Sequence, residues 1–334
     1  MNRDQSADGP LPSHHQKTGG FRNPWPASQP QGARGVLKWI LSRRRESRSD
    51  GVAPPAVTAA IAPNAHDPGL SLTWIGHSTF LIQSDGLSVL TDPIWSERAS
   101  PVQFAGPRRH SPPGLEFDAL PAIDAVFLSH DHYDHLDDST VRRLIARYPQ
   151  TQWIAPIGVG GFLRKGGAAN VAEMDWWQSR KFGRIAVDCT PAQHFSGRYP
   201  WNRNATLWVG WVIGLGGKRV LFGGDTGLHP EFADIARRFG PFYAAILPIG
   251  AYEPRWFMQP VHMNPEDATE AYLQISQTDG SGECMFVPSH WGTFNLTDEP
   301  LDEPPRRLAS AWTAAALPES RLRRLNPGET LTLS

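Results

Sequence analysis

Cysteine is scarce in this chain, with only Cys189 and Cys284 among 334 residues. Two cysteines so far apart in sequence do not make a framework of disulfides, so we interpret both as buried thiols. No stretch approaches the roughly 20 consecutive apolar residues of a membrane span, and the first residues lack the apolar segment of a signal peptide. We therefore expect a cytoplasmic chain.

Clustered positive charge is also lacking over most of the chain. Residues 1–50 hold nine Lys and Arg against four Asp and Glu, which leaves 23 against 29 for the rest. Nucleic-acid binding requires a basic track. The acidic body therefore argues against a nucleic-acid partner.

The chain divides into four segments by composition. Residues 1–33 are rich in Pro, Gly, Ser and Gln and predict an irregular or disordered tail. Residues 34–46 predict an amphipathic helix with a basic end, and residues 47–68 predict a linker. Residues 69–334 form the main domain.

The helix predicted at 34–46 leaves two interpretations open. Its apolar side chains fall on one face and three arginines follow them, as in helices that dock on a domain and in helices that lie on a membrane surface. The apolar residues are Val36, Leu37, Ile40 and Leu41.

The main domain mixes strands and helices. A hairpin series begins at Leu70, with Asp85 and Gly86 as a tight turn. Asn264 followed by Pro265 and acidic residues is typical of a helix start. Further helices are expected near residues 138–147, 229–239, 265–277 and 305–315. The pattern predicts an α/β (α+β) fold of layered sheets flanked by helices.

Residues 128–136, "LSHDHYDHL", follow an apolar run and concentrate ligand-type side chains. In an extended segment His130 and His132 point the same way, and the following turn can bring Asp134 and His135 nearby. One segment can thus supply two metal ions, with zinc, iron or manganese all compatible. Other strand ends offer candidates to complete such sites, namely His194, Asp225 and His290.

The spacing H-x-H-x-D-H, with the later His, Asp and His, resembles the metallo-β-lactamase superfamily. The stretches "FRNPWP", "LTDPIWSERASPVQFAGPRR", "GDTG" and "HWGTF" further resemble the N-acyl-phosphatidylethanolamine-hydrolysing phospholipase D family over residues 21–330. The resemblance implies a four-layer αββα sandwich with two Zn²⁺ ions per chain. It assigns the ligands residue by residue: one zinc to His130, His132 and His194, the second to Asp134, His135 and His290, and both to Asp225.

The same resemblance implies that a hydroxide held by the two zinc ions attacks the phosphorus of a phospholipid. Asp134, Asp225 and His262 are then the candidate catalytic residues, with His262 placed to bind phosphate or protonate the leaving group beside a helix start. Asp92 would orient the ligand loops or, alternatively, cap the turn before Pro93. Val261 departs from the family's Gln before this histidine, which leaves the substrate open.

Other side chains near these motifs have two interpretations each. His77 and His110 are expected to be structural, and Arg108, Arg109 and Arg255 either bind a lipid phosphate or pair with carboxylates. One aromatic set lines an acyl-chain groove or packs in the core: Trp176, Trp177, Tyr252, Trp256 and Phe257.

Three functions remain open from the sequence. The leading one is a phospholipid phosphodiesterase that touches the inner face of a membrane, with a homodimer suggested by the family. The second is a hydrolase of a soluble ester, lactone or cyclic phosphodiester, because one metal centre serves many chemistries. The third is a metal-binding, membrane-associated protein without catalysis.

Overall fold

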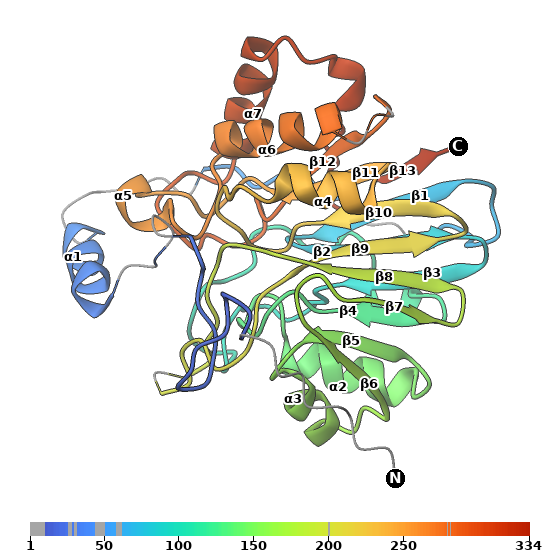
Figure 1. The fold of residues 1–334 in the computed structure, drawn as a ribbon, viewed down its shortest axis with the longest axis horizontal. Coiled ribbons are helices and arrows are strands. Elements are labelled where there is room, and N and C mark those ends of the chain that lie inside the picture. The colour runs from blue at the N-terminus through green and yellow to red at the C-terminus, as the bar shows by residue number, and fades with distance from the viewer. Residues whose placement is uncertain are drawn as a thin grey trace.

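The computed structural model describes residues 11–25, 29, 32–43, 51–57, 62–199, 201–278, 280 and 282–334. Two β-sheets pack face to face, with helices on both outer faces (Figure 1). The predicted four-layer αββα arrangement is therefore confirmed. The beginning of the predicted tail, residues 1–10, and the basic end of the predicted helix, residues 44–46, lie outside the described residues.

The first sheet has seven strands in the order β13-β1-β2-β3-β4-β5-β6. β13, β1, β2 and β3 pair antiparallel, whereas β3, β4, β5 and β6 pair parallel. The strands are β1 (Leu70–Gly76), β2 (Thr79–Ser84), β3 (Leu87–Thr91), β4 (Ala125–Phe127), β5 (Gln152–Pro156), β6 (Asn170–Met174) and β13 (Thr330–Leu333).

The second sheet has six strands in the order β12-β11-β10-β9-β8-β7. β7 to β10 form an antiparallel meander, and β10, β11 and β12 pair parallel. The strands are β7 (Ser179–Phe182), β8 (Ile185–Thr190), β9 (Gly210–Leu215), β10 (Lys218–Phe222), β11 (Ala244–Pro248) and β12 (Met285–Ser289).

Helices α2 and α3 cover the first sheet, and α4, α6 and α7 cover the second (Figure 1). The helices expected near 138–147, 229–239, 265–277 and 305–315 correspond to α2, α4, α6 and α7. The helices are α1 (Ala33–Arg43), α2 (Asp138–Arg147), α3 (Gly160–Lys165), α4 (Phe232–Phe239), α5 (Arg255–Met258), α6 (Pro265–Thr278) and α7 (Glu303–Ala314).

The alternation of side chains along the strands builds the two apolar layers. In β2, Phe80 and Ile82 belong to the core shared with the second sheet, whereas Leu81 belongs to the core under α2. Burying each such side chain contributes about 1.5–3 kcal/mol. At the β2–β3 turn, Asp85 and Gly86 have φ of 52° and 74°, the left-handed pair that a two-residue hairpin requires.

The segment before the main domain packs against it. Residues 11–25 contain no helix or strand, yet the Nε2 atoms of His14 and His15 lie 2.7 and 2.8 Å from the two carboxylate oxygens of Asp175. The indole of Trp25 stacks on that of Trp176 at 5.9 Å. Residues 11–25 are therefore anchored to the main domain near both ends, by the contacts of His14 and His15 with Asp175 and by the stacking of Trp25 on Trp176.

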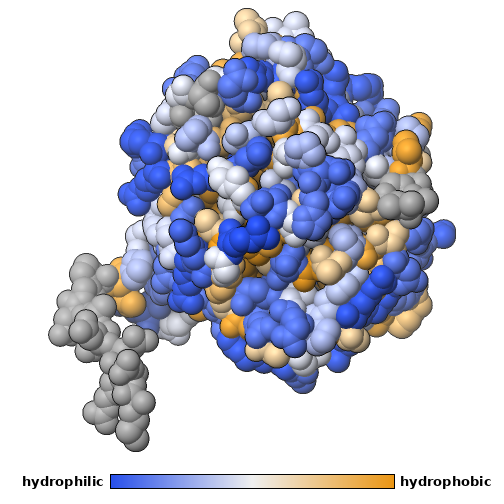
Figure 2. All heavy atoms as spheres, turned by 90° about the vertical axis from the view of Figure 1, so that its right-hand side faces the viewer, coloured by the Kyte–Doolittle hydropathy of each residue, from blue (hydrophilic) through white to orange (hydrophobic). Residues whose placement is uncertain are grey.

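The described residues on the face opposite α1 are mostly hydrophilic. Figure 2 shows that hydrophilic residues cover most of this face, with apolar residues between them in small groups. Within the described part of the chain, no helix combines the length and the apolar character that crossing a bilayer requires.

Candidate metal centre

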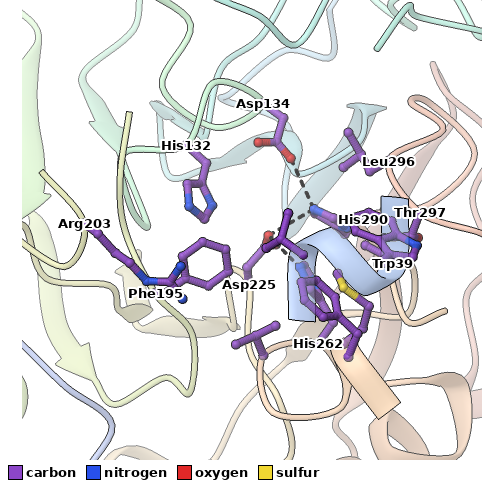
Figure 3. Close-up of a pocket in the computed structure, with 15 residues that line it drawn as sticks. Trp39, His132, Asp134, Phe195, Arg203, Asp225, His262, His290, Leu296 and Thr297 are labelled. Carbon is purple, nitrogen blue, oxygen red and sulfur yellow. Dashed lines mark ion pairs between the residues drawn. The ribbon is translucent and has the colours of Figure 1, made fainter. Parts of the chain in front are cut away.

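Ends of strands from both sheets converge on one edge of the sandwich. The segment after β4 carries His130, and the segments after β8, β10 and β12 carry His194, Asp225 and His290. Figure 3 shows His132, Asp134, Asp225 and His290 turned toward a common centre. The structure thus brings together every residue that the sequence analysis proposes as a metal ligand.

The first donor group contains three imidazoles. The Nε2 atom of His130 lies 2.8 Å from Nδ1 of His132, and Nε2 of His194 lies 3.2 Å from the same Nδ1. The Oδ2 atom of Asp225 lies 3.9 Å from Nε2 of His130 and 3.8 Å from Nε2 of His194. The three imidazoles and the Asp225 carboxylate therefore form one compact group of possible metal ligands.

The second donor group shares Asp225 with the first. Its Oδ2 atom lies 3.1 Å from Nε2 of both His135 and His290. The Oδ2 atom of Asp134 lies 3.3 Å from Nε2 of His135 and 3.4 Å from Nε2 of His290. Asp225 therefore lies between the two donor groups.

Both donor groups have the dimensions of a metal site. Ligands about 2.0–2.1 Å from a tetrahedral ion lie about 3.3 Å from one another, close to the separations here. The Nε2 atoms of His135 and His290 and Oδ1 of Asp225 are buried without a hydrogen-bond partner among the described residues. An unpaired buried polar group costs about 1–3 kcal/mol. These clusters are able to bind metal, because a cation would satisfy all three atoms.

Burial keeps the first group neutral. Burial and the neighbouring imidazoles lower the pKa of His132 to about 3. Burial also lowers the pKa of His194 to about 4, although the charge of Asp225 opposes that shift. The pKa of His130 also falls well below its usual value. A neutral imidazole is the form that binds metal.

The second group attracts positive charge. Burial disfavours the charged form of His290, but Asp225 and Asp134 outweigh it and raise its pKa to about 9. The same carboxylates raise the pKa of His135, while the two imidazoles hold the pKa of Asp225 well below its usual range despite burial. The local field thus favours a cation, and metal binding there would release protons.

Asp92 contacts His135 directly and His130 through Ser129, on the side of the rings away from the shared donor atoms. It has a φ of 34°, and its Oδ2 atom lies 2.7 Å from Nδ1 of His135. The backbone N–H and the hydroxyl of Ser129 donate to this carboxylate at 2.7 and 2.6 Å, and the Ser129 hydroxyl also lies 2.9 Å from Nδ1 of His130. Such partners fix the ring orientation of metal-binding histidines, in agreement with the orienting interpretation of Asp92.

His77 lies closer to the centre than a purely structural histidine would. Its Nε2 atom is 2.9 Å from Oδ2 of Asp134, and its ring lies 4.1 Å from that of His290. Its backbone N–H donates to the hydroxyl of Thr293, and its carbonyl accepts from the N–H of His290. His77 therefore contacts two members of the second donor group.

The His194 loop is held by residues far away in sequence. Nδ1 of His194 lies 2.9 Å from the carbonyl oxygen of Val261. The side chain of Asn23 donates to the His194 carbonyl at 2.9 Å and accepts from its backbone N–H at 3.2 Å. The segment expected to be a tail thus supports a candidate ligand.

A cavity of about 300 Å³ opens onto both donor groups. One wall is apolar and comes from α1, α5 and the loops beside them, with Val36, Trp39, Phe257, Met258, Val261 and Leu296. The other side carries Phe195 and Arg203 (Figure 3). The cavity can therefore receive a ligand with an apolar arm next to the donor atoms.

The candidate catalytic residue His262 also lines this cavity. Its Nε2 atom lies 3.9 Å from Oδ2 of Asp225, and its buried Nδ1 atom has no hydrogen-bond partner among the described residues. Burial lowers its pKa well below the usual value. At the start of α6 nearby, the backbone N–H of Asp267 donates to Oδ1 of Asn264 at 2.8 Å, and the backbone N–H of Asn264 donates to Oδ2 of Asp267 at 3.4 Å. These two N–H groups are therefore already engaged within the protein.

Several side chains considered from the sequence lie elsewhere. Arg108 pairs with Glu97 at 2.6 Å, Arg109 donates to the carbonyl of Ile94, and Arg255 pairs with Asp267 at 2.6 Å. From the aromatic set, only Phe257 lines the cavity.

Four residues around the centre were missed from the sequence. Asn23 and Arg203 lie in segments without a regular apolar pattern, Trp39 lies in the helix predicted at 34–46, and His77 is a lone histidine that was expected to be structural. Only "FRNPWP", which contains Asn23, carried a signal, through the family resemblance.

Comparison with known proteins agrees with this geometry. Residues 88–291 match the beta-lactamase superfamily domain. An uncharacterised protein of Mycobacterium tuberculosis is 43% identical over 303 residues, which are 90% of this chain and 80% of that protein. The N-acyl-phosphatidylethanolamine-hydrolyzing phospholipase D 1 of Caenorhabditis elegans is 39% identical over 259 residues, which are 74% of this chain and 71% of that protein.

A solved structure shares the fold. The isothiocyanate hydrolase from Delia radicum gut bacteria superposes with a TM-score of 0.61 at 21% identity, over 79% of this chain and 99% of that chain. This likeness shows the fold alone, because one fold hosts many reactions.

Proposed function

This chain belongs to the beta-lactamase superfamily, and from that premise we propose that it is a metal-dependent hydrolase of the phospholipase D type. Its substrate would be N-acyl-phosphatidylethanolamine or a related phospholipid. The observation that carries the proposal is the pair of donor groups joined by Asp225 at the floor of a cavity with an apolar wall. The similarity to the Caenorhabditis elegans phospholipase supports it.

We infer that two zinc ions occupy the donor groups, one held by the first, one by the second and both by Asp225. When bound, such ions lower the pKa of coordinated water towards 7 and offset negative charge on phosphoryl oxygens. Asp92 and Ser129 keep the rings of His135 and His130 in position. The apolar wall limits the access of bulk water and so strengthens these interactions.

His262 is the residue that we infer contacts the reacting phosphoryl group. Its neutral imidazole carries one N–H, lies in the cavity and has a nitrogen free of protein partners among the described residues. Its N–H can therefore hydrogen-bond a phosphoryl oxygen, whereas protonating the departing alcohol would require the imidazolium form, which burial disfavours. We expect His262→Gln to lower kcat by about 10²–10⁴-fold with both metals retained; loss of the metals would instead make His262 a ligand.

The rim of the cavity supports contact with a lipid surface. On α1, Val36 and Trp39 line the cavity, whereas Leu37 and Leu41 are 58% and 50% exposed. Trp256 on the neighbouring α5 is 41% exposed, with the ammonium of Lys38 over its ring (Figure 1). Apolar side chains beside basic ones are typical of interfacial helices, so we infer that α1 packs on the domain through Val36 and Trp39 and contacts the lipid surface through Leu37 and Leu41.

The experiment that tests the function measures metal content and lipid hydrolysis on the same protein. Two zinc ions per chain, with release of N-acylethanolamine from vesicles, would support the proposal. Bound metal with turnover only of soluble esters, lactones or cyclic phosphodiesters would replace the lipid substrate. Bound metal without turnover of any of these would favour a binding protein.

A further inference from the structure

Arg203 is a cation at the cavity for which the described residues supply no anionic partner. It lines the cavity together with the candidate ligands His132 and Asp225. Within the described ranges, no carboxylate pairs with Arg203 and no hydrogen bond engages its guanidinium. Of the three arginines considered from the sequence, Arg108 and Arg255 pair with carboxylates, and Arg109 donates to the carbonyl of Ile94.

The guanidinium stands close to the reaction centre. Its Cζ atom lies 5.0 Å from the centroid of the Phe195 ring, and that ring lies 4.6 Å from the ring of His132 and 4.7 Å from the ring of His194. A guanidinium that stacks on an aromatic ring keeps its N–H edge available for hydrogen bonds. The Phe195 ring therefore lies between the guanidinium of Arg203 and the candidate ligands His132 and His194.

The backbone around Arg203 is fixed. The next residue, Asn204, has a φ of 57°, donates from its N–H to the Ser196 carbonyl at 2.9 Å, and accepts at its own carbonyl from the N–H of Phe21 at 2.8 Å. Gly197 packs against it, since a Cβ there would lie 3.4 Å from the Cα atom of Arg203. These contacts constrain the backbone next to the arginine.

The cavity is chemically asymmetric about the donor groups. Figure 3 shows Arg203 and Phe195 on one side and Trp39 and Leu296 on the other. Burial also lowers the pKa of Arg203 from its usual value, which means that its charge has lost part of its hydration. A partly desolvated cation gains most from an anionic ligand, because hydrogen bonds between charged groups are the strongest ones.

We propose that Arg203 is a specificity-determining residue that binds an anionic group, such as a carboxylate, on the alcohol portion of the substrate. This proposal rests on the proposed function and deepens it: the preferred phosphodiesters carry an apolar arm and a second negative charge near the scissile phosphate. The bidentate fit of guanidinium to carboxylate supplies the selectivity.

The test compares two substrates that differ by one carboxylate, N-acyl-phosphatidylserine and N-acyl-phosphatidylethanolamine. Both are presented in phosphatidylcholine vesicles whose surface charge is equalised with a non-substrate anionic lipid. We expect the wild type to favour the serine lipid in kcat/KM by about 10- to 100-fold. Arg203→Gln should abolish this preference, Arg203→Lys should keep part of it, and Arg203→Glu should reverse it.

The control is Arg180→Gln, which removes an exposed arginine on β7 and should leave the preference unchanged. A wild type without preference, or an Arg203→Gln variant that slows both lipids equally, would overturn the proposal. Calorimetric titration of the metal-loaded protein with O-phosphoserine and with phosphoethanolamine provides a readout that needs no turnover. Tighter binding of phosphoserine that is lost in Arg203→Gln would support the role of Arg203 even if neither lipid were hydrolysed and the proposed function failed.

Discussion

Replacing Asp225 with Asn tests the electrostatics of the metal centre directly. The pKa of His290 rises from 6.5 to about 9, which corresponds to roughly 3 kcal/mol in favour of positive charge at its ring. Burial opposes this shift, so the attraction from the carboxylates exceeds that value, and Asp225 is the largest contributor. Because Asp225 is the largest of these contributors, removing its charge should cost on the order of 1 kcal/mol or more, which predicts an affinity for metal lower by about tenfold or more.

The assay is competition for zinc against a chelator of known affinity, with metal content measured by mass spectrometry. Because Asp225 contacts both donor groups, we expect Asp225→Asn to weaken both ions, whereas Asp188→Asn on β8, outside every donor group, serves as the matched control. An Asp225→Asn protein that kept two ions with wild-type affinity would refute the reasoning.

Two further predictions concern residues that support the ligands. His77→Phe removes the contact with Oδ2 of Asp134 at 2.9 Å and should weaken the ion in the second group by about 10- to 100-fold, whereas His77→Gln retains a donor and should lose less; chelator competition that shows no difference between the variants would count against this role. Asp175 has a pKa below 3.8, because its contacts with His14 and His15 outweigh burial. Its contribution to stability is therefore complete above pH 3.8 and lost as the pH falls through the lower folded-state value. Asp175→Asn should remove this acid transition and increase hydrogen exchange in residues 11–25, and unchanged exchange there would contradict it.

Much of the fold was predictable because its signals are local. The tight turn at Asp85 and Gly86, the cap at Asn264 and the apolar strands each depend on a few consecutive residues. β6, β7 and β13 carry weaker local signals, since β7 is largely exposed and β13 alternates between exposed and half-buried residues. These strands lie at the edges of their sheets, where pairing with a neighbour stabilises them more than their own composition.

The candidate ligands were predictable for a different reason. Metal binding needs particular side chains, and His130, His132, Asp134 and His135 stand together in one short segment. The supporting residues carry no such signal, because their function comes from distant partners. Asn23 reaches His194 across 171 positions of sequence, a contact that only the folded chain creates.

Position 261 offers a test of how the apolar wall selects a substrate. The side chain of Val261 lines the cavity and is 3% exposed, while its backbone carbonyl accepts the hydrogen bond from His194. Val261→Gln, which restores the residue of the resembled family, therefore leaves that backbone contact in place and adds an amide to the cavity. We expect unchanged metal content, because the candidate ligands keep their partners.

The added amide should hydrogen-bond polar groups of the substrate, which the valine cannot do. We expect the ratio of kcat/KM for N-acyl-phosphatidylethanolamine over phosphatidylcholine to rise by about 3- to 10-fold, the range of one neutral hydrogen bond. Val261→Met is the control, since it lengthens the side chain without a donor. An equal change in both variants would mean that cavity volume, rather than hydrogen bonding at this position, selects the lipid, and loss of zinc in Val261→Gln would show that the side chain also supports the His194 ligand.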